Sequence, residues 1–168
     1  MVKTISTRIL PAGVTLRQAG AEDIPEMIAV INSAFEAENF FVNRPRTHAA
    51  QLTEHLGNGH FLLAHDGGKL IASVYYELRG ERGYIGMLAV RPDQQLRGLG
   101  RTMMHLAEQA LRDAACSIAE LTVVSVRTTL PPFYYKLGYV ESGLAKVPEE
   151  LQQKLSMPVE LVRMEKLL

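Results

Sequence analysis

The period of the hydrophobic positions changes several times along the chain, and each change separates a predicted strand from a predicted helix. Apolar and polar residues alternate over residues 14–18, which predicts a first strand. A stripe at three- and four-residue spacing follows and predicts a helix, with Asp23 and Glu26 as a capping box and Pro25 in the first turn. The stripe consists of Ile24, Met27, Ile28, Ile31 and Phe35.

A meander of three strands is predicted in the middle of the chain. Before it, Thr47 caps a short helix that runs over residues 47–56. Residues 60–65 and 69–78 are two strand-like runs, and the DGG segment between them is a compact hairpin signal. Residues 84–90 form the next strand, so the three runs indicate an antiparallel arrangement.

The second half of the chain alternates between helices and strands. Residues 120–126 are rich in β-branched side chains and predict a buried strand after a long helix, an order that is typical of a parallel pair. Residues 131–137 are predicted to form a short helix. Another strand is predicted to begin at residues 139–140, and residues 158–164 are predicted to form the last strand. The buried stripe of the long helix consists of Met103, Leu106, Ala107, Ala110, Leu111 and Ala114.

Length and composition fit one soluble globular domain over residues 1–168. Lys plus Arg equals Asp plus Glu at 18 each, so no overall field draws the chain to nucleic acid or to an anionic membrane. No apolar run approaches the roughly 20 residues of a membrane helix. Cys116 is the only cysteine, which excludes an intrachain disulfide, and we expect no metal and a cytoplasmic location.

A glycine-rich turn stands between the strand over residues 84–90 and the long helix. Gly98 and Gly100 let the chain turn tightly and let an anion approach the free N–H groups of the helix N-terminus. Arg97 and Arg101 flank the turn and favour a phosphate or pyrophosphate as the ligand. Glycines also serve ordinary strand-to-helix turns. The dinucleotide and P-loop motifs fail here, because the third glycine of the first and the lysine of the second are missing.

Two sequence motifs give a more specific indication. Residues 90–100, VRPDQQLRGLG, hold V-x-P followed by Q-x-x-G-x-G, and residues 133–139 read FYYKLGY. The first resembles the central motif of the GNAT superfamily, the acyl-CoA-dependent N-acyltransferases. The second resembles the family signature commonly written [FL]-Y-x-K-x-G-[FY]. The resemblance covers nearly the whole chain and is strongest over residues 84–139.

The resemblance implies an α/β (α+β) fold, with a mixed, mostly antiparallel sheet of about six to seven strands that is flanked by about four helices and splayed at the cofactor slot. It also implies an enzyme that transfers the acetyl group of acetyl-CoA, its co-substrate, to a primary amine by direct attack in a ternary complex. The backbone of the central strand and the glycine turn would then bind the cofactor. These positions are Leu88, Ala89, Val90, Gln95, Leu96, Arg97, Gly98, Leu99, Gly100 and Arg101.

The second motif implies that Tyr134 is the general acid toward the leaving thiolate, with Tyr135 as a second candidate. A core aromatic with a satisfied hydroxyl is the structural alternative for Tyr134. The N–H of Leu88 is expected to stabilise the charge that develops on the thioester oxygen. Arg127 stands where many relatives have an asparagine. Three roles are compatible with an arginine at this position: a contact with the cofactor phosphates, a contact with an acidic acceptor, or a solvent-facing position.

The general base is unassigned at this stage. Many relatives carry a glutamate on the strand before the central motif, where this chain has Tyr84 and Gly86. An amine with the pKa of a lysine, about 10.4, must lose a proton before it attacks, so some group has to accept one. The candidates, each with an ordinary surface or capping role as its alternative, are Glu77, Glu81, His48 and His60.

Two other classes of function compete with an enzyme. A catalytically inactive acyl-CoA-binding or regulatory module would keep the fold and the slot; the missing strand glutamate favours it, whereas Tyr134 favours catalysis. A nucleic-acid-binding protein is disfavoured by the balanced charge. The sequence does not determine the acceptor, a small amine or a peptide amine, or the acyl chain length, and specificity is expected in residues 35–59 and in the loops near Arg79 and Leu144. Many relatives dimerise, so a homodimer is compatible with the resemblance.

Overall fold

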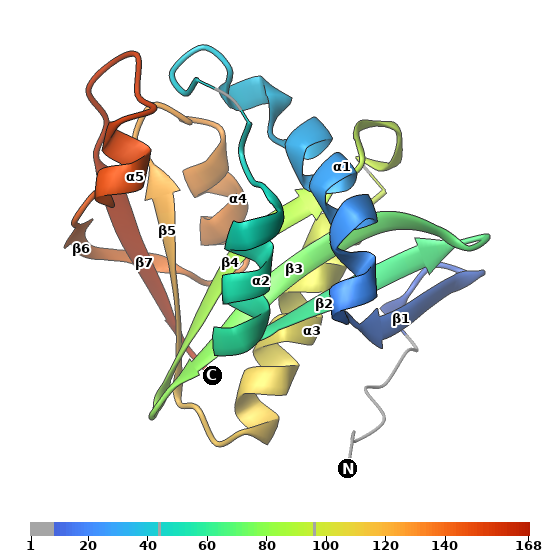
Figure 1. Ribbon diagram of the computed structural model, residues 1–168. Coiled ribbons are helices and arrows are strands. Elements are labelled where there is room, and N and C mark those ends of the chain that lie inside the picture. Colours follow the sequence, from blue (N-terminus) through green and yellow to red (C-terminus); the bar gives the residue numbers. More distant parts are fainter. Residues whose placement is uncertain (1–8, 44, 96) are drawn as a thin grey trace.

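A single mixed sheet of seven strands runs through the molecule (Figure 1). The computed structural model describes residues 9–43, 45–95 and 97–168. The strand order is β1-β2-β3-β4-β5-β7-β6, and every neighbouring pair is antiparallel except β4 and β5. The bounds are β1 Val14–Gln18, β2 His60–Asp66, β3 Lys69–Arg79, β4 Arg82–Val90, β5 Ile118–Val124, β6 Val140–Ala145 and β7 Leu161–Leu167.

Helices cover both faces of this sheet (Figure 1). α1 (Ile24–Ala34) and α2 (Ala49–Asn58) lie on one face, and α3 (Leu99–Asp113) lies on the other. α4 (Leu130–Lys136) packs into the same hydrophobic cluster as α3, and α5 (Glu149–Gln152) is a single turn. The mixed, mostly antiparallel architecture confirms the predicted fold class. Within the described ranges, no helix combines the length and the apolar character that crossing a membrane requires.

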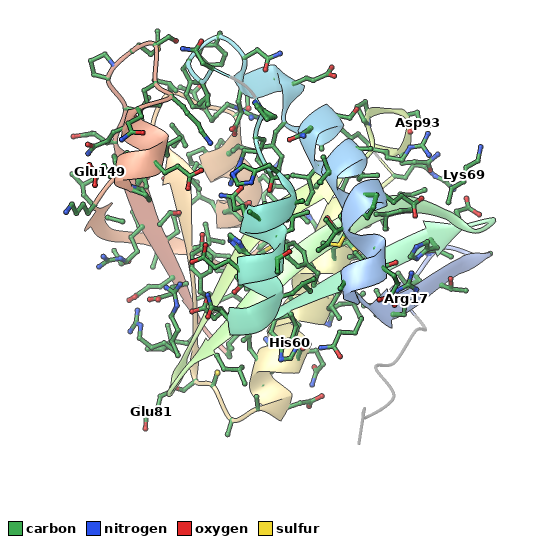
Figure 2. All side chains as sticks on the ribbon, viewed as in Figure 1. Arg17, His60, Lys69, Glu81, Asp93 and Glu149 are labelled. Carbon is green, nitrogen blue, oxygen red and sulfur yellow. The ribbon has the colours of Figure 1, made fainter. Side chains whose placement is uncertain are left out.

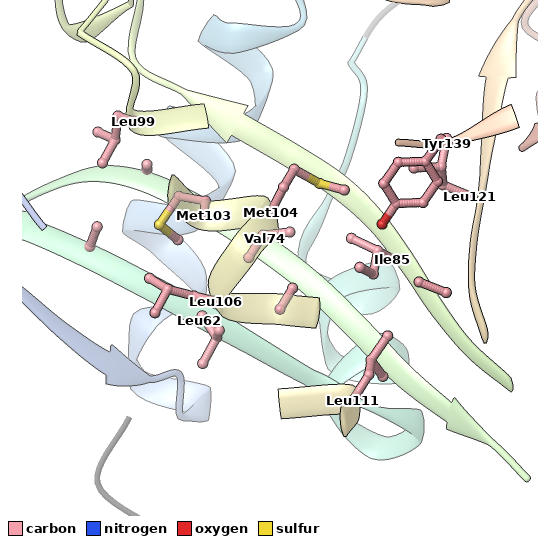
Figure 3. Close-up of a cluster of buried hydrophobic side chains, with 14 of the residues drawn as sticks. Leu62, Val74, Ile85, Leu99, Met103, Met104, Leu106, Leu111, Leu121 and Tyr139 are labelled. Atoms are coloured by element: carbon pink, nitrogen blue, oxygen red, sulfur yellow. The ribbon is translucent and has the colours of Figure 1, made fainter. Parts of the chain in front are cut away.

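Side chains alternate along the strands and so build one hydrophobic cluster on each face. On β2, Leu62 belongs to the cluster under α3, whereas Phe61 and Leu63 belong to the cluster under α1. Figure 3 shows the first cluster, to which α3 contributes Met103 and Leu106. This packing holds α3 against the middle of the sheet, and residues 91–98 connect the end of β4 to its N-terminus.

The β2–β3 hairpin confirms the predicted meander. Gly67 and Gly68 connect the two strands with φ angles of 56° and 79°, the left-handed conformation that a type I′ turn requires at both positions. The predicted strand, helix, strand unit is confirmed as well, since β4 and β5 pair in parallel around α3. Several ends differ from the prediction: β4 and β5 begin earlier and β7 begins later, because pairing partners rather than the local pattern set the ends.

The predicted capping box at α1 is wrong. Glu26 Oε1 accepts the N–H of Leu70 on β3 at 2.9 Å. The Asp23 carboxylate accepts both terminal nitrogens of Arg17, at 2.7 and 2.5 Å, and the N–H of Gly20 at 2.8 Å. The Asp23 carboxylate binds the charged Arg17 of β1 instead of the amides of its own helix, because charge-assisted hydrogen bonds are stronger than neutral ones. Both carboxylates therefore fasten α1 to the sheet.

The start of α2 also differs from the prediction. Thr47 does not cap the helix: it is buried, and its N–H donates to Asn32 Oδ1 at 2.9 Å. The N-cap is His48, whose Nδ1 accepts the N–H of Gln51 at 3.4 Å. Burial of the Thr47 backbone explains the shift, because a buried N–H needs a fixed partner.

β4 and β5 pair over a short distance and then separate. Residues 82–84 face residues 118–120, and beyond this point the two strands diverge (Figure 1). The predicted splay of the sheet is thereby confirmed. Backbone groups on the facing edges lose their strand partners where the strands part, and each has to be satisfied in another way.

β4 carries a β-bulge within the splayed region. Ser73 faces Ala89 and Tyr75 faces Gly86, so two residues of β4 oppose one residue of β3. One of the two, Met87, has a φ of 48°, in the left-handed region that few non-glycine residues adopt. Such a bulge bends the strand and changes the direction of its backbone groups.

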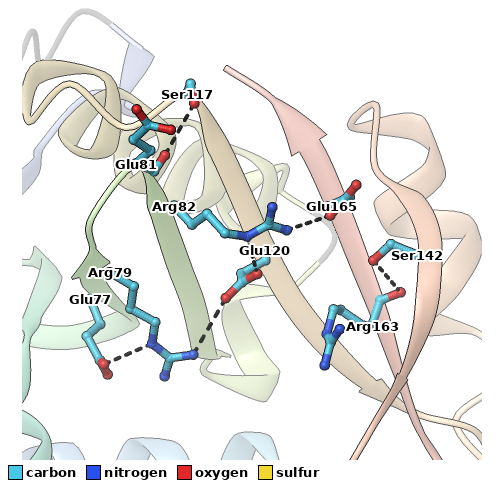
Figure 4. A network of polar contacts seen from close by, with 9 residues as sticks. All are labelled: Glu77, Arg79, Glu81, Arg82, Ser117, Glu120, Ser142, Arg163 and Glu165. Atoms are coloured by element: carbon cyan, nitrogen blue, oxygen red, sulfur yellow. Dashed lines mark hydrogen bonds and ion pairs between the residues drawn. The ribbon is translucent and has the colours of Figure 1, made fainter.

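An ion-pair network ties the strands together where β4 and β5 still pair (Figure 4). The Arg82 guanidinium donates to Glu120 at 2.9 Å and to Glu165 at 2.6 Å, and so links β4, β5 and β7. Arg79 of β3 lies 2.9 Å from Glu77 and 3.6 Å from Glu120. Each exposed pair is worth about 0–1 kcal/mol. The network nevertheless connects four strands, β3, β4, β5 and β7, and it lies at the point beyond which β4 and β5 separate.

Replacing Asp23 tests the fastening of α1. The hydrogen bond from Arg17 lowers the pKa of Asp23 to about 2, so the folded state binds the proton more weakly than the unfolded chain does. We expect Asp23→Asn to lower the free energy of unfolding by about 1–2 kcal/mol at pH 7, with the difference from wild type shrinking between about pH 4 and pH 2. Urea denaturation at several pH values measures this. Glu22→Gln is the matched control, and an equal loss in both variants would contradict the assignment.

Candidate active site

One cavity of about 830 Å³ occupies the opening between β4 and β5. Its walls come from residues 84–88 of β4 and residues 121–124 of β5. On the α3 face it is lined by the start of α3 and by α4, and on the α1 face by the segment between α1 and α2, by α2 itself and by α5. The cavity therefore reaches both faces of the sheet through the splay.

The first turn of α3 lies at this cavity. Gly98 precedes the helix with a φ of 75°, a left-handed conformation that glycine adopts without steric cost. The N–H of Thr102 donates to the Gly98 carbonyl at 3.1 Å, so the three preceding amides stand before the first intrahelical donor of α3. Residues 98–101 all line the cavity. A helix N-terminus of this kind attracts anions.

Gly100 lies against the wall of the cavity. A Cβ built on Gly100 would meet three side chains of the cavity wall at distances of 3.7–3.9 Å, those of Leu88, Val90 and Phe133. The side chain of Gln95 also lines the cavity, and its Nε2 donates to the Val90 carbonyl at 3.1 Å. The turn is thus connected to the end of β4 by a side-chain hydrogen bond.

Tyr134 brings a phenol to the same cavity from α4. Its ring meets those of Phe133 and Tyr139 edge to face, at centroid distances of 5.1 and 6.0 Å. Burial, the largest cause, raises the pKa of Tyr134 to about 12. The hydroxyl therefore keeps its proton at neutral pH and is available as a donor.

Two loops that line the cavity on the α1 face are joined to each other. Val42 and Leu155 form an antiparallel bridge. The N–H of Asn43 donates to a backbone carbonyl at 2.7 Å, that of Lys154, and the N–H of Ser156 donates to the Phe41 carbonyl at 2.9 Å. The wall on this side is consequently a continuous backbone structure.

Comparison with known proteins settles the family. Residues 20–161 match the family model described as an acetyltransferase (GNAT) domain. The chain belongs to the GNAT acetyltransferases. It is accordingly an acetyl-CoA-dependent N-acetyltransferase, with acetyl-CoA as its co-substrate.

Solved GNAT structures share the fold at low sequence identity. The PaiA N-acetyltransferase of Thermoplasma acidophilum, solved in complex with coenzyme A, has a TM-score of 0.75 and 16% identity, over 92% of this chain and 99% of that one. The ribosomal-protein-S18-alanine N-acetyltransferase of Escherichia coli has a TM-score of 0.74 and 16% identity, over 92% and 93%. The ribosomal-protein-alanine N-acetyltransferase of Brucella melitensis has a TM-score of 0.73 and 19% identity, over 92% and 99%. No curated protein sequence matches significantly.

Most of the GNAT site residues predicted from sequence line the cavity, namely Leu88, Val90, Gln95, Gly98, Leu99, Gly100, Arg101, Arg127 and Tyr134. Two others lie elsewhere. The side chain of Ala89 is buried in the cluster under α1, and the guanidinium of Arg97 donates to Gln94 Oε1 at 2.6 Å. Leu96 lies outside the described residues. Tyr135 is exposed and donates a short hydrogen bond to Glu141, which leaves Tyr134 as the motif tyrosine at the cavity.

Arg127 has a partner that sequence reasoning did not anticipate. Its NH1 lies 3.1 Å from Oε1 of Glu38, a buried carboxylate in the 3₁₀ turn Glu36–Glu38. A buried carboxylate requires a countercharge, and Arg127 supplies one across the cavity. Both residues line the cavity and both act on the electrostatics of Tyr134.

The four candidate bases from the sequence do not line the cavity. Glu77 accepts hydrogen bonds from Arg79 and from the Tyr75 hydroxyl, and the first of these lowers the pKa of Glu77. Glu81 lies at the tip of the β3–β4 hairpin and His60 at the start of β2, as Figure 2 shows. His60 Nδ1 is 2.6 Å from Gln18 Nε2, and His48 lies 3.6 Å from Glu150.

The sequence reasoning missed several ionisable cavity residues, among them His55, Glu38 and Glu150. The available signal was weak: Gln51 and His55 are one turn apart, so they share one face of α2, but only the tertiary structure shows that this face meets the cavity. Tyr84 also lines the cavity, and its ring lies over Gly86, where a Cβ would come within 2.7 Å of it. The glycine on β4 thus makes room for the tyrosine.

Alanine at the two glycines of the turn should affect stability differently. Gly98 adopts a left-handed φ, so Gly98→Ala is expected to lower the free energy of unfolding by about 1 kcal/mol. Gly100 lies within α3, where a Cβ makes only ordinary contacts, so Gly100→Ala should leave stability unchanged or raise it by up to about 1 kcal/mol. Chemical denaturation measures both. Equal losses in the two variants would contradict the role assigned to Gly98.

Proposed function

We propose that this GNAT enzyme transfers the acetyl group of acetyl-CoA to a primary amine by direct attack in a ternary complex, with Tyr134 as the general acid. The observation that carries the proposal is the cavity that passes through the splay. It joins the N-terminus of α3, the bulged edge of β4 and the Tyr134 hydroxyl on one side of the sheet to a second chamber under α1 and α2 on the other. Two substrates can therefore meet between the strands.

The α3 side suits the charged end of the cofactor. In the proposal, the backbone amides of residues 96–101 bind the pyrophosphate, and the Arg101 side chain faces the same anion from the cavity wall. Arg97 would contribute through its backbone, because its guanidinium is held by Gln94. Arg127 would act on the phosphates only at a distance, since Glu38 binds it.

The edge of β4 suits the pantetheine arm. Among the described residues, none pairs with this edge on the β5 side beyond residue 84, and an unpaired buried backbone group costs about 1–3 kcal/mol. Amide groups of the pantetheine would pair with the backbone of Leu88, Ala89 and Val90 in the way that an added strand does. The thioester would then lie at the bulge, next to the cavity.

The chemistry follows from this placement. A free amine attacks the thioester carbonyl carbon, and negative charge develops on the carbonyl oxygen, which the N–H of Leu88 stabilises. The bulge at Met87 supports this role, because it redirects the backbone that follows. As the carbon–sulfur bond breaks, the Tyr134 hydroxyl donates its hydrogen to the thiolate. A pKa of about 12 supports this role, because the Tyr134 hydroxyl then still carries its proton when the thiolate leaves.

The acceptor is proposed only as a primary amine. The chamber on the α1 face combines aromatic residues, Phe35 and Phe41, with the Glu38–Arg127 pair, which suits an amine with an apolar body. Two structural neighbours are named for acetylating the alanine of ribosomal proteins, so an Ala-terminated peptide belongs among the acceptors to be tested beside small amines. A homodimer stays a prediction.

Replacing Tyr134 tests the assignment of the acid. We expect Tyr134→Phe to lower turnover about 10²-fold or more while acetyl-CoA affinity stays nearly the same, because the missing hydroxyl acts on the departing thiolate and not on the bound thioester. Amine-dependent release of free thiol measures turnover, and calorimetry measures affinity. Tyr135→Phe is the control. Unchanged turnover in Tyr134→Phe would remove Tyr134 from the mechanism, and no thiol release by wild type would indicate an inactive acyl-CoA-binding module.

A larger side chain at Gly100 tests the cofactor site. Gly100→Val would place its methyl groups between Leu88, Val90 and Phe133, in the space proposed for the cofactor. We expect acetyl-CoA affinity to fall at least about tenfold, which corresponds to about 1.4 kcal/mol. Gly57→Val, at a helix position with open space around it, is the matched control. Equal affinity in both variants, measured by calorimetric titration, would place the cofactor elsewhere.

A further inference from the structure

The proposed reaction requires a proton acceptor, and the cavity offers few. Among the described residues that line it, the side chains able to take a proton at neutral pH are Glu38, His55 and Glu150. Glu38 is ion-paired with Arg127 at 3.1 Å. Glu150 is exposed and accepts from Lys154 at 3.0 Å, a contact that lowers its pKa. His55 is the group that remains.

The structure fixes the tautomer of His55. Its Nδ1 lies 2.7 Å from the backbone carbonyl oxygen of Gln51, one turn earlier on α2. A carbonyl only accepts, so Nδ1 carries the hydrogen in this contact. In the neutral ring Nε2 then holds a lone pair that can accept a proton. This arrangement is the one that a general base requires before it meets a substrate.

The surroundings of His55 are aromatic on one side and polar on the other. Phe61 of β2 and Tyr75 of β3 pack against the ring at centroid distances of 6.2 and 4.8 Å. The Tyr75 hydroxyl donates to the Glu77 carboxylate at 2.8 Å, and Arg79 donates to the same carboxylate at 2.9 Å. Tyr84 of β4 lies beyond Tyr75, at 6.5 Å between the rings.

A second observation on the same helix face points to a ligand with N–H groups. Gln51 lines the cavity beside His55, and its Oε1 is buried without a hydrogen-bond partner among the described residues. An unsatisfied buried acceptor costs about 1–3 kcal/mol. An N–H donor on the bound acceptor would satisfy it, and the two side chains together would receive an ammonium group.

We infer that His55 is the general base of this enzyme and that Gln51 orients the acceptor amine; the inference rests on the proposed function. His55 Nε2 takes a proton from the ammonium group, which leaves a free amine and an imidazolium. The amine nitrogen bonds to the thioester carbonyl carbon, the carbon–sulfur bond breaks, and the thiolate receives the Tyr134 proton. The new amide nitrogen gives up its second proton, which restores Tyr134, and the imidazolium releases its proton to solvent.

Kinetics across pH test the role of His55. The probes are 2-phenylethylamine, agmatine and an Ala-terminated tetrapeptide, and the measured quantity is kcat/KM for the one that wild type acetylates. We expect a wild-type limb that falls toward acid within about pH 5–8, where histidines titrate. His55→Gln should lower kcat/KM at pH 7 about 10²-fold or more. In this variant the acidic limb should disappear, and kcat/KM should rise steadily with pH in proportion to the fraction of acceptor present as free amine.

Three further variants separate a base from a structural role. His60→Gln is the matched control and should keep both rate and limb, because His60 lies outside the cavity. Tyr134→Phe should keep the limb at a lower rate. Gln51→Met retains the backbone carbonyl that orients His55, so it should raise KM and leave the limb in place. A His55→Gln enzyme that keeps the wild-type limb would overturn the inference.

A spectroscopic measurement tests the inference without an acceptor. In protein labelled with ¹⁵N at histidine, His55 is assigned by its absence from His55→Gln. We expect its neutral form to carry the proton on Nδ1; a proton on Nε2 would overturn the inference. If wild type releases no thiol with any probe, the proposed function itself fails, whereas activity with an unaltered His55→Gln profile refutes only the base.

Discussion

The short pairing between β4 and β5 is the constraint on which the rest of the structure depends. Residues 82–84 and 118–120 hold the strands together, and the network around Arg82 ties this point to β7. Beyond it the strands diverge, and α3 packs on one face of the sheet and α1 on the other. Exposed backbone along the opening costs free energy unless something pairs with it, so the fold presents an edge that a ligand completes.

One strained backbone position, Met87, lies beside this opening. Gly98 holds its left-handed φ without steric cost, but Met87 does not, and such a conformation costs about 1–3 kcal/mol in a non-glycine residue. Met87 persists in it because its side chain is buried in the cluster under α1 and because the bulge fixes the register on both sides. Packing of the Met87 side chain on the α1 face therefore stabilises a strained backbone conformation, and this conformation changes the direction of the strand backbone at the cavity.

Sequence periodicity predicted most helices and strands, and the resemblance to the GNAT family predicted the fold class and most of the residues that line the cavity. Strands, helices and the glycine turn are local patterns, and the turn at Gly98 and the motif tyrosine Tyr134 both lie at the cavity as expected. Contacts between distant segments were not predictable. Asp23 meets Arg17 across a turn, and Arg127 meets Glu38 from the other end of the chain. The partner of each carboxylate depends on which cationic side chain the folded structure brings close to it, and a local sequence pattern does not contain that information.

The proton acceptor illustrates the same point through one side chain. At Gly86 of β4, one of the two positions where many relatives carry a glutamate, a Cβ would come within 2.7 Å of the Tyr84 ring, so a larger side chain there requires Tyr84 to move. On α2, His55 packs against the ring of Tyr75, whose hydroxyl donates to the Glu77 carboxylate of β3 at 2.8 Å. Glu77 is held by Arg79, which also contacts Glu120 at the point where the sheet divides. The ion pairs at the point where the sheet divides are thus connected, through Glu77 and the Tyr75 hydroxyl, to the ring that packs against His55.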